Sequence, residues 1–137
     1  MEVTPLDDAL SRVGDRWTLL VVDALMPGPL RFGELSERVG GIAPNVLSKR
    51  LKQLESDGIV LGTPYSERPV RVAYALTGLG RDLAGALSLI ASWGAGLAEH
   101  HHEHHHTACG SPLVARLWCP TCDQPVDESD ATSDIPA

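Results

Sequence analysis

Hydrophobic residues in the first 25 positions recur at steps of three and four, which is the spacing of one face of an α-helix. This stripe predicts an amphipathic helix that is broken or bent near Gly14. The run MPGPL then ends the helix, because proline cannot continue it. The stripe consists of Leu6, Leu10, Val13, Trp17, Leu20, Val21 and Leu25.

Two shorter helices follow, with a glycine-containing turn between them. The run FGELSERV places Phe32, Leu35 and Val39 on one face of a short helix, and GGIAP turns the chain. Pro44 suits the first turn of the next helix, which ends at the pair DG, where a glycine favours helix termination. The residues that this third helix should bury are Leu47, Leu51 and Leu54.

The hydrophobic period then changes from helical spacing to alternation. IVLGTPY and VRVAYAL flank SERP, and in the second run hydrophobic residues occupy every other position from Val70 to Leu76. This pattern predicts a β-hairpin. Thr77 can cap a last helix, which should continue to Trp93. Its hydrophobic positions are Leu79, Leu83, Leu87, Ile90 and Trp93.

The order of these elements predicts an α+β fold, mainly α, of the winged helix-turn-helix type with a two-stranded wing. Two helices joined by a tight turn and followed by a hairpin are typical of this fold. We expect it to occupy residues 1–97. In such domains the second helix of the pair enters the major groove of double-stranded DNA.

The net charge of −7 argues against a nucleic-acid partner only until its distribution is considered. Residues 123–137 carry five acids and no base, whereas residues 1–98 carry 11 acids and 10 bases. From Pro44 to Arg71 the local charge is +2. A basic surface on the folded part is therefore compatible with the composition. With neither a signal-like N-terminus nor an apolar run of about 18 residues, we expect a cytoplasmic protein that does not contact membranes.

The polar side of the third helix carries the residue types that read DNA. If the leucines face the core, the helical wheel puts Asn45, Lys49, Lys52 and Gln53 on the opposite side, with Ser48 at its edge. Asparagine and glutamine pair with adenine, lysine with guanine or phosphate, and serine with either. The alternative is that any soluble helix has a polar outer face.

Three stretches resemble the HxlR family of bacterial winged-helix transcription regulators. They are GDRWTLLVVDALMPGPLRFGELSERVGGIAPNVLSKRLKQLESDGIV, VRVAYALTGLGRDLAGAL and WG, in the order and spacing of that family. The resemblance implies a homodimer, expected to act as a repressor, joined through its first and last helices and reading a two-fold related operator. It assigns DNA contacts to Arg31, which opens the helix before the third one, to Pro44, Asn45, Ser48, Lys49 and Lys52 on the third helix, and to Arg68 and Arg71 in the wing.

Two positions depart from the family pattern. Thr4 stands before Pro5 where members commonly carry a cysteine, so a redox response at that position is excluded by chemistry. Ala43 stands where a serine usually caps the recognition helix, and the missing oxygen should cost roughly 1 kcal/mol of capping.

The C-terminal end contains all three cysteines, in HTACGSPLVARLWCPTC. His106-x2-Cys109 and Cys119-x2-Cys122 are two pairs separated by nine residues, a spacing that predicts a structural zinc ribbon with four protein ligands. We expect a His-rich linker at 98–105, the ribbon at 106–126 and an acidic disordered tail at 127–137.

Other interpretations of this end remain open. His104 or His105 can take the place of His106 as a ligand. The cysteines of CPTC can instead form a redox dithiol, or the three cysteines can be unrelated residues of an unstructured C-terminal segment. The end can also gate DNA binding as a metal or redox sensor, or form a small zinc or thiol enzyme. No triad or phosphate loop is present, so we expect no enzyme activity. The sequence does not identify a small-molecule effector.

Overall fold

The computed structural model describes residues 3–97 and 105–131. The chain forms two compact units, Met1–Ser88 and Leu89–Ala137. The division falls inside one continuous helix, α6 (Ala84–Leu97), so the boundary expected after residue 97 stays a prediction. None of the helices in the described ranges is long and apolar enough to cross a membrane.

The predicted break near Gly14 is confirmed, and it separates α1 (Pro5–Val13) from α2 (Arg16–Leu25). Each helix has its own side-chain cap. The Asp7 amide donates to Thr4 Oγ1 at 3.1 Å, and the Thr18 amide donates to Asp15 Oδ1 at 3.0 Å. These caps satisfy amides that a helix start leaves without partners, which is why two helices form in place of one bent helix.

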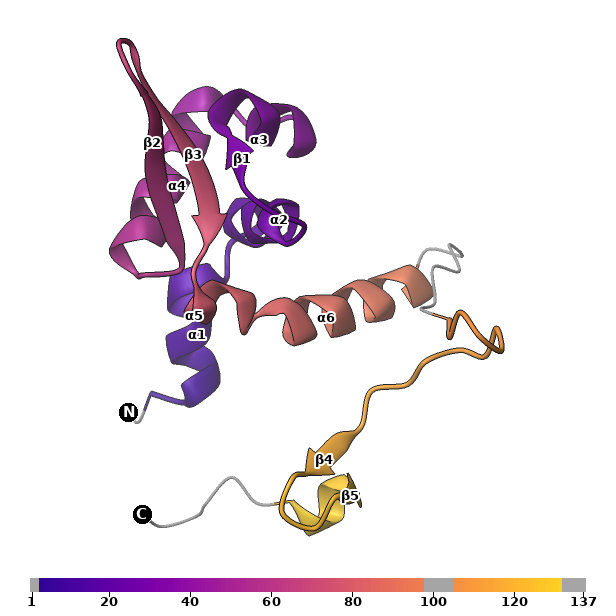
Figure 1. The fold of residues 1–137 in the computed structure, drawn as a ribbon. Coiled ribbons are helices and arrows are strands. Elements are labelled where there is room, and N and C mark those ends of the chain that lie inside the picture. Colours follow the sequence, from indigo (N-terminus) through magenta and orange to yellow (C-terminus); the bar gives the residue numbers. More distant parts are fainter. Residues whose placement is uncertain (1–2, 98–104, 132–137) are drawn as a thin grey trace. The chain divides into compact units, whose positions relative to one another are not determined.

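The predicted helix pair is α3 (Phe32–Arg38) and α4 (Pro44–Ser56), which lie beside each other in Figure 1. Leu47, Leu51 and Leu54 of α4 are buried, as the leucine spacing predicted. Ala43 is the N-cap of α4 and makes no side-chain cap bond, in agreement with the expectation from sequence. The chain leaves α4 through Gly58, whose φ of 71° suits a residue without a side chain.

The wing is the antiparallel hairpin of β2 (Val60–Glu67) and β3 (Val70–Leu76), which confirms the predicted hairpin. A third strand, β1 (Leu30–Arg31), was not predicted and pairs with β3 through Leu30↔Tyr74. The strand order is β1-β3-β2. In Figure 1 the hairpin extends past α4 at one end of the first unit, and α1 lies at the other end.

The last helix differs from the prediction because the segment from Thr77 to Trp93 is divided. Thr77 caps α5 (Gly78–Arg81), and the Gly80 amide donates to its Oγ1 at 3.2 Å. The Leu83 amide then bonds to the Gly80 carbonyl, three residues back, so a turn precedes α6. The helix also continues past the predicted end at Trp93 to Leu97.

Thr77 also links three elements of the first unit. Its hydroxyl donates to the carbonyl of Gly58 at 2.6 Å and lies 3.2 Å from that of Ile59. Its amide donates to the Ile59 carbonyl at 3.0 Å. The end of α4, the base of the wing and the start of α5 therefore meet at one residue.

A single hydrophobic core lies among α2, α3, α4 and the sheet. Leu83 and Leu87 pack against its edge, half-buried. The N-terminal part of the predicted stripe is not covered, because Leu6 and Leu10 of α1 are exposed. The fully or nearly fully buried centre consists of Val21, Val22, Leu25, Leu35, Leu47, Leu51 and Leu54.

The second unit contains a small hairpin, β4 (Leu117–Cys119) and β5 (Gln124–Val126), followed by the 3-10 helix η1 (Glu128–Asp130). A separate turn begins near His105, which forms an isolated bridge with Pro112. Of the expected His-rich linker and acidic tail, residues 98–104 and 132–137 lie outside the described residues.

Candidate nucleic-acid interface

The polar side of α4 presents the residues that the helical wheel selected. Asn45, Lys49 and Lys52 are exposed, and Ser48 is half-buried at the edge of that face. Pro44 begins the helix and is also exposed. The structure therefore gathers all five predicted α4 residues on or beside one accessible surface, where side chains of this kind can reach base edges and phosphates.

Arg50, which lies between Lys49 and Lys52 in the sequence, does not belong to this surface. Its Nε lies 3.2 Å from Asp15 Oδ1, and its side chain is 31% exposed. The ion pair joins the middle of α4 to the cap of α2. Burial opposes ionisation of Asp15, but hydrogen bonds from the Thr18 hydroxyl and amide, together with Arg50, outweigh burial and hold the pKa of Asp15 below its ordinary value.

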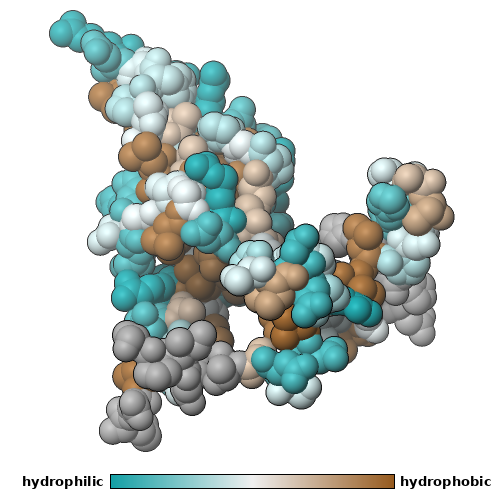
Figure 2. Space-filling model, turned by 60° about the horizontal axis from the view of Figure 1, so that its bottom comes forward, coloured by the Kyte–Doolittle hydropathy of each residue, from teal (hydrophilic) through white to brown (hydrophobic). Residues whose placement is uncertain are grey.

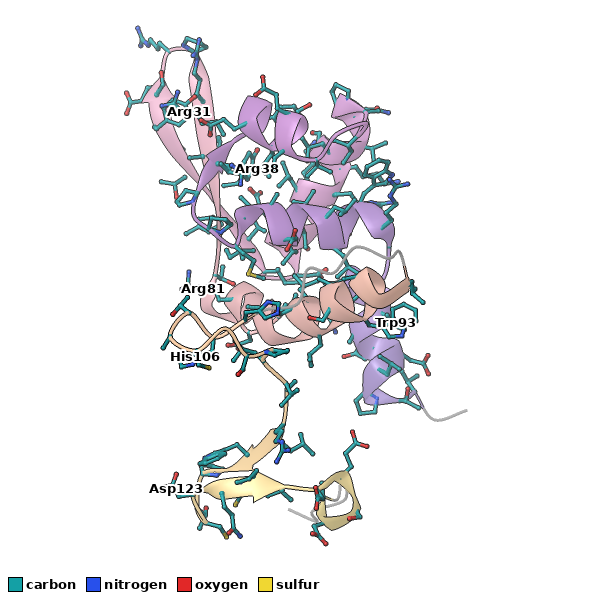
Figure 3. All side chains as sticks on the ribbon, turned by 90° about the vertical axis from the view of Figure 1, so that its right-hand side faces the viewer. Arg31, Arg38, Arg81, Trp93, His106 and Asp123 are labelled. Atoms are coloured by element: carbon teal, nitrogen blue, oxygen red, sulfur yellow. The ribbon has the colours of Figure 1, made fainter. Side chains whose placement is uncertain are left out.

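Arg31 lies where β1 ends and α3 begins. This agrees with its predicted place at the start of the helix before α4. Its amide donates to Glu34 Oε2 at 2.8 Å. The guanidinium carbon lies 4.5 Å from the ring centroid of Tyr65 in the wing, a cation–π distance. Figure 3 shows Arg31 beside the hairpin. Sequence reasoning missed Tyr65, because nothing in the alternation of β2 marks it as a partner of Arg31.

The tip of the wing carries the two predicted arginines. Arg68 lies in the turn between β2 and β3, and Arg71 pairs in register with Ser66 where the ladder shifts at Pro64. Both arginines are exposed. Arginines on such a hairpin are placed to contact a phosphate backbone or a minor groove.

Several large hydrophobic side chains of α6 and of α1 are exposed. On α6, Leu89, Trp93 and Leu97 follow one another at four-residue steps and are 53%, 70% and 69% exposed. Figure 3 labels Trp93 on this helix, and Figure 2 shows hydrophobic residues, in brown, reaching the surface between polar ones. Leu6 and Leu10 of α1 are likewise exposed.

The first Cys/His pair lies in a tight turn. His106 Nδ1 lies 3.2 Å from Cys109 Sγ. Hydrogen bonds from the hydroxyl and the amide of Ser111, and the contact with His106, lower the pKa of the Cys109 thiol. Figure 3 shows His106 in this turn.

The second pair lies at the end of the small hairpin. The amides of Cys122 and Thr121 donate to the sulfur of Cys119, and these bonds, with one from the Cys122 side chain, lower the pKa of the Cys119 thiol. Asp123, labelled in Figure 3, completes the turn. Among residues 3–97 and 105–131, no three or more His, Cys, Asp or Glu side chains gather in one cluster, so the two pairs are not joined.

Comparison with known proteins places the winged helix in a family. The sequence profile of a family described as HxlR-like helix-turn-helix matches residues 12–102. An uncharacterized HTH-type transcriptional regulator of Mycobacterium tuberculosis is 36% identical over 129 residues, covering 90% of this chain and 80% of that protein. This match reaches beyond α6 into the segment that carries the cysteines.

Solved structures show the same similarity. The reduced form of the transcriptional regulator YodB from Bacillus subtilis superimposes with a TM-score of 0.60 and 35% identity, over 72% of this chain and 97% of that one. The redox regulator HypR in its reduced form gives a TM-score of 0.64 and 30% identity, over 68% and 92%. The similarity covers most of each neighbour and about seven tenths of this chain.

Proposed function

This chain belongs to the HxlR-like helix-turn-helix family of transcriptional regulators, and on that premise we propose that it acts as a homodimeric repressor that binds a two-fold related operator. The family and its relatives are DNA-binding regulators and not enzymes. The observation that carries the finer proposal is the accessible polar surface on α4, in the element that helix-turn-helix proteins insert into the major groove.

In this proposal α4 reads bases and the residues around it hold the phosphate backbone. Asn45, Ser48, Lys49 and Lys52 face the major groove from α4, while Arg31 lies at the start of the preceding helix. The wing arginines Arg68 and Arg71 contact the backbone on the flank of the site. Because Arg50 is bound to Asp15, it supports the position of α4 and is not assigned a DNA contact.

The dimer of this proposal uses the exposed hydrophobic side chains of α1 and α6. A monomer would leave Leu6, Leu10, Leu89 and Trp93 in water, and burying apolar area is the main driving force of association. A two-fold dimer presents two α4 helices, one for each half-site of a palindromic operator. Each half-site then contributes to the affinity of the whole.

The deciding experiment is to sequence the genomic DNA that co-purifies with the full chain, and then to measure binding to the recovered operator. We expect a palindromic site with half-sites about one helical turn apart. The Lys49→Ala/Lys52→Ala double variant should lose most of the operator affinity. Arg38→Ala/Arg116→Ala removes the same number of charges outside α4 and the wing and should bind nearly as the parent. Unchanged binding by the double lysine variant would contradict the proposal.

A further inference from the structure

We propose that the C-terminal segment binds one Zn²⁺ through His106, Cys109, Cys119 and Cys122, and that this metal is structural. The inference concerns a site that the regulator function does not require, and it rests on two preformed pairs of ligands in residues 105–131. Each pair brings two potential ligand side chains into one turn.

The first half-site is a closed turn. The Gly110 amide donates to the His106 carbonyl at 2.7 Å, and the His106 amide donates to the Ser111 carbonyl at 2.8 Å. These bonds bring the His106 ring nitrogen to 3.2 Å from Cys109 Sγ, so the two potential ligand atoms lie next to each other. The Ser111 amide donates to the same sulfur.

The second half-site repeats this arrangement on another framework. Cys119 ends β4 opposite Gln124, and the chain returns through the four-residue turn Pro120–Asp123. The turn directs the amides of Thr121 and Cys122 at the sulfur of Cys119 and leaves Cys122 beside it. Two independent segments therefore each present two donors, and the second repeats the amide-to-sulfur bonding of the first.

The donor set selects the metal. Three thiolates and one imidazole form a soft nitrogen and sulfur set, which suits tetrahedral Zn²⁺ and not Mg²⁺ or Ca²⁺. Four protein ligands fill a tetrahedron and leave no open position, which is the arrangement of a structural site.

Residues 105–131 contain no buried side chain. The large apolar residues between the pairs are Leu113, Val114, Leu117 and Trp118, which are 57%, 75%, 49% and 57% exposed. A segment this short cannot build a sufficient core by itself, so metal binding supplies the free energy of its folding.

Zinc binding must join the two half-sites, because they are not gathered in the structure. Residues 113–116 between them have no regular secondary structure. The nine residues from Gly110 to Trp118 span at most about 30 Å when extended and can fold back, so the chain permits closure. Once the pairs meet, Leu117 and Trp118 can pack against the turn that carries His106.

The test uses the full chain, purified under reducing conditions without chelator. We expect about one zinc per chain by elemental analysis and three thiols that react with a thiol reagent only after a chelator is added. Replacement of zinc by Co²⁺ should give the visible bands of a tetrahedral site and a charge-transfer band of thiolate–cobalt bonds. Operator binding is not a readout here, so failure of the regulator proposal would not affect the result.

Matched variants identify the ligands. Cys109→Ser, Cys119→Ser and Cys122→Ser should each reduce bound zinc to a small fraction. His106→Ala should weaken zinc binding by a factor of ten or more, on the order of the effect of losing one ligand. His105→Ala removes the neighbouring histidine and leaves His106 in place. It therefore serves as the control, and its zinc content should be unchanged. Loss of zinc in His105→Ala but not in His106→Ala would overturn the histidine assignment.

Two results would overturn the site itself. One is a zinc content far below one per chain together with three freely reactive thiols. The other is a Cys119–Cys122 disulfide in the freshly purified chain, detected as the loss of two hydrogens by mass spectrometry, which would assign the pair to redox chemistry.

Discussion

Arg50 Nε lies 3.2 Å from Asp15 Oδ1, so α4, the helix that we propose to face DNA, is linked to the cap of α2. Asp15 has two roles, because its carboxylate also accepts the amide of Thr18 at the start of α2. Asp15 and Arg50 are 35 positions apart in the sequence, so local patterns do not reveal this ion pair, which leaves Arg50 less available to a nucleic acid than the exposed lysines of α4.

Asp15→Asn should separate the charge of this residue from its capping role. Asparagine keeps one oxygen for the Thr18 amide but loses the pairing with Arg50 and the second oxygen that accepts the Thr18 hydroxyl, so the free energy of unfolding should fall slightly. Asp15→Ala also loses the cap and should cost about 1 kcal/mol more. Urea unfolding of both variants beside the parent measures the difference.

The same pair predicts a pH dependence. The pKa of Asp15 is lowered in the folded state, so its contribution is present above the ordinary carboxyl pKa of about 4 and is lost as the pH falls through the folded-state pKa. The stability gap between the parent and Asp15→Asn should therefore shrink on acidification. A gap that stays constant from neutral to acidic pH would contradict the lowered pKa.

Asn45→Ala and Arg71→Ala should weaken DNA binding in different ways. Asn45 is exposed on the base-reading face of α4, so its loss should relax base preference at one operator position and cost roughly 1 to 3 kcal/mol. Arg71 lies in the wing, and its loss should weaken binding evenly and reduce the salt dependence by about one unit of slope. Titrations on operator and scrambled DNA at several salt concentrations distinguish the two effects.

Trp93→Glu should prevent dimer formation without unfolding the monomer. The Trp93 side chain is 70% exposed, so its replacement removes little from the core, while a charge at this position opposes burial against a second copy. Ala91→Glu puts the same charge on the opposite side of α6 and serves as the control. Sedimentation should show a monomer for Trp93→Glu, with loss of operator affinity, and a dimer for Ala91→Glu. A Trp93→Glu dimer would contradict the role of α6.

Removal of zinc by a chelator should leave the winged helix folded. Its core lies among α2, α3, α4 and the sheet, and no residue of the Cys/His segment belongs to it. The thermal transition followed by helix circular dichroism should therefore stay near that of the untreated protein, while proteolysis should become faster between residues 106 and 126. Collapse of the helical signal on chelation would show that the winged helix depends on the metal.

Local patterns predicted most elements, since capping residues and leucine spacing act within a few residues. They missed β1, because two residues carry no period, and the turn at Leu83, because the leucines keep helical spacing across it. The helical wheel placed Asn45 and Lys49 correctly but did not show that Arg50 binds Asp15, a contact between separate helices. Cysteine spacing predicted two pairs, whereas their meeting depends on long-range folding that spacing does not determine.

The hydrogen bonds of Thr77 also link the movement of α5 to that of α4. Its hydroxyl donates to the carbonyl of Gly58, just after α4, and accepts a hydrogen bond from the Gly80 amide in α5. A rotation of α5 must therefore either break these bonds or carry the end of the DNA-facing helix with it. Thr77 thus couples the position of α5 to that of the helix that we propose to read the operator.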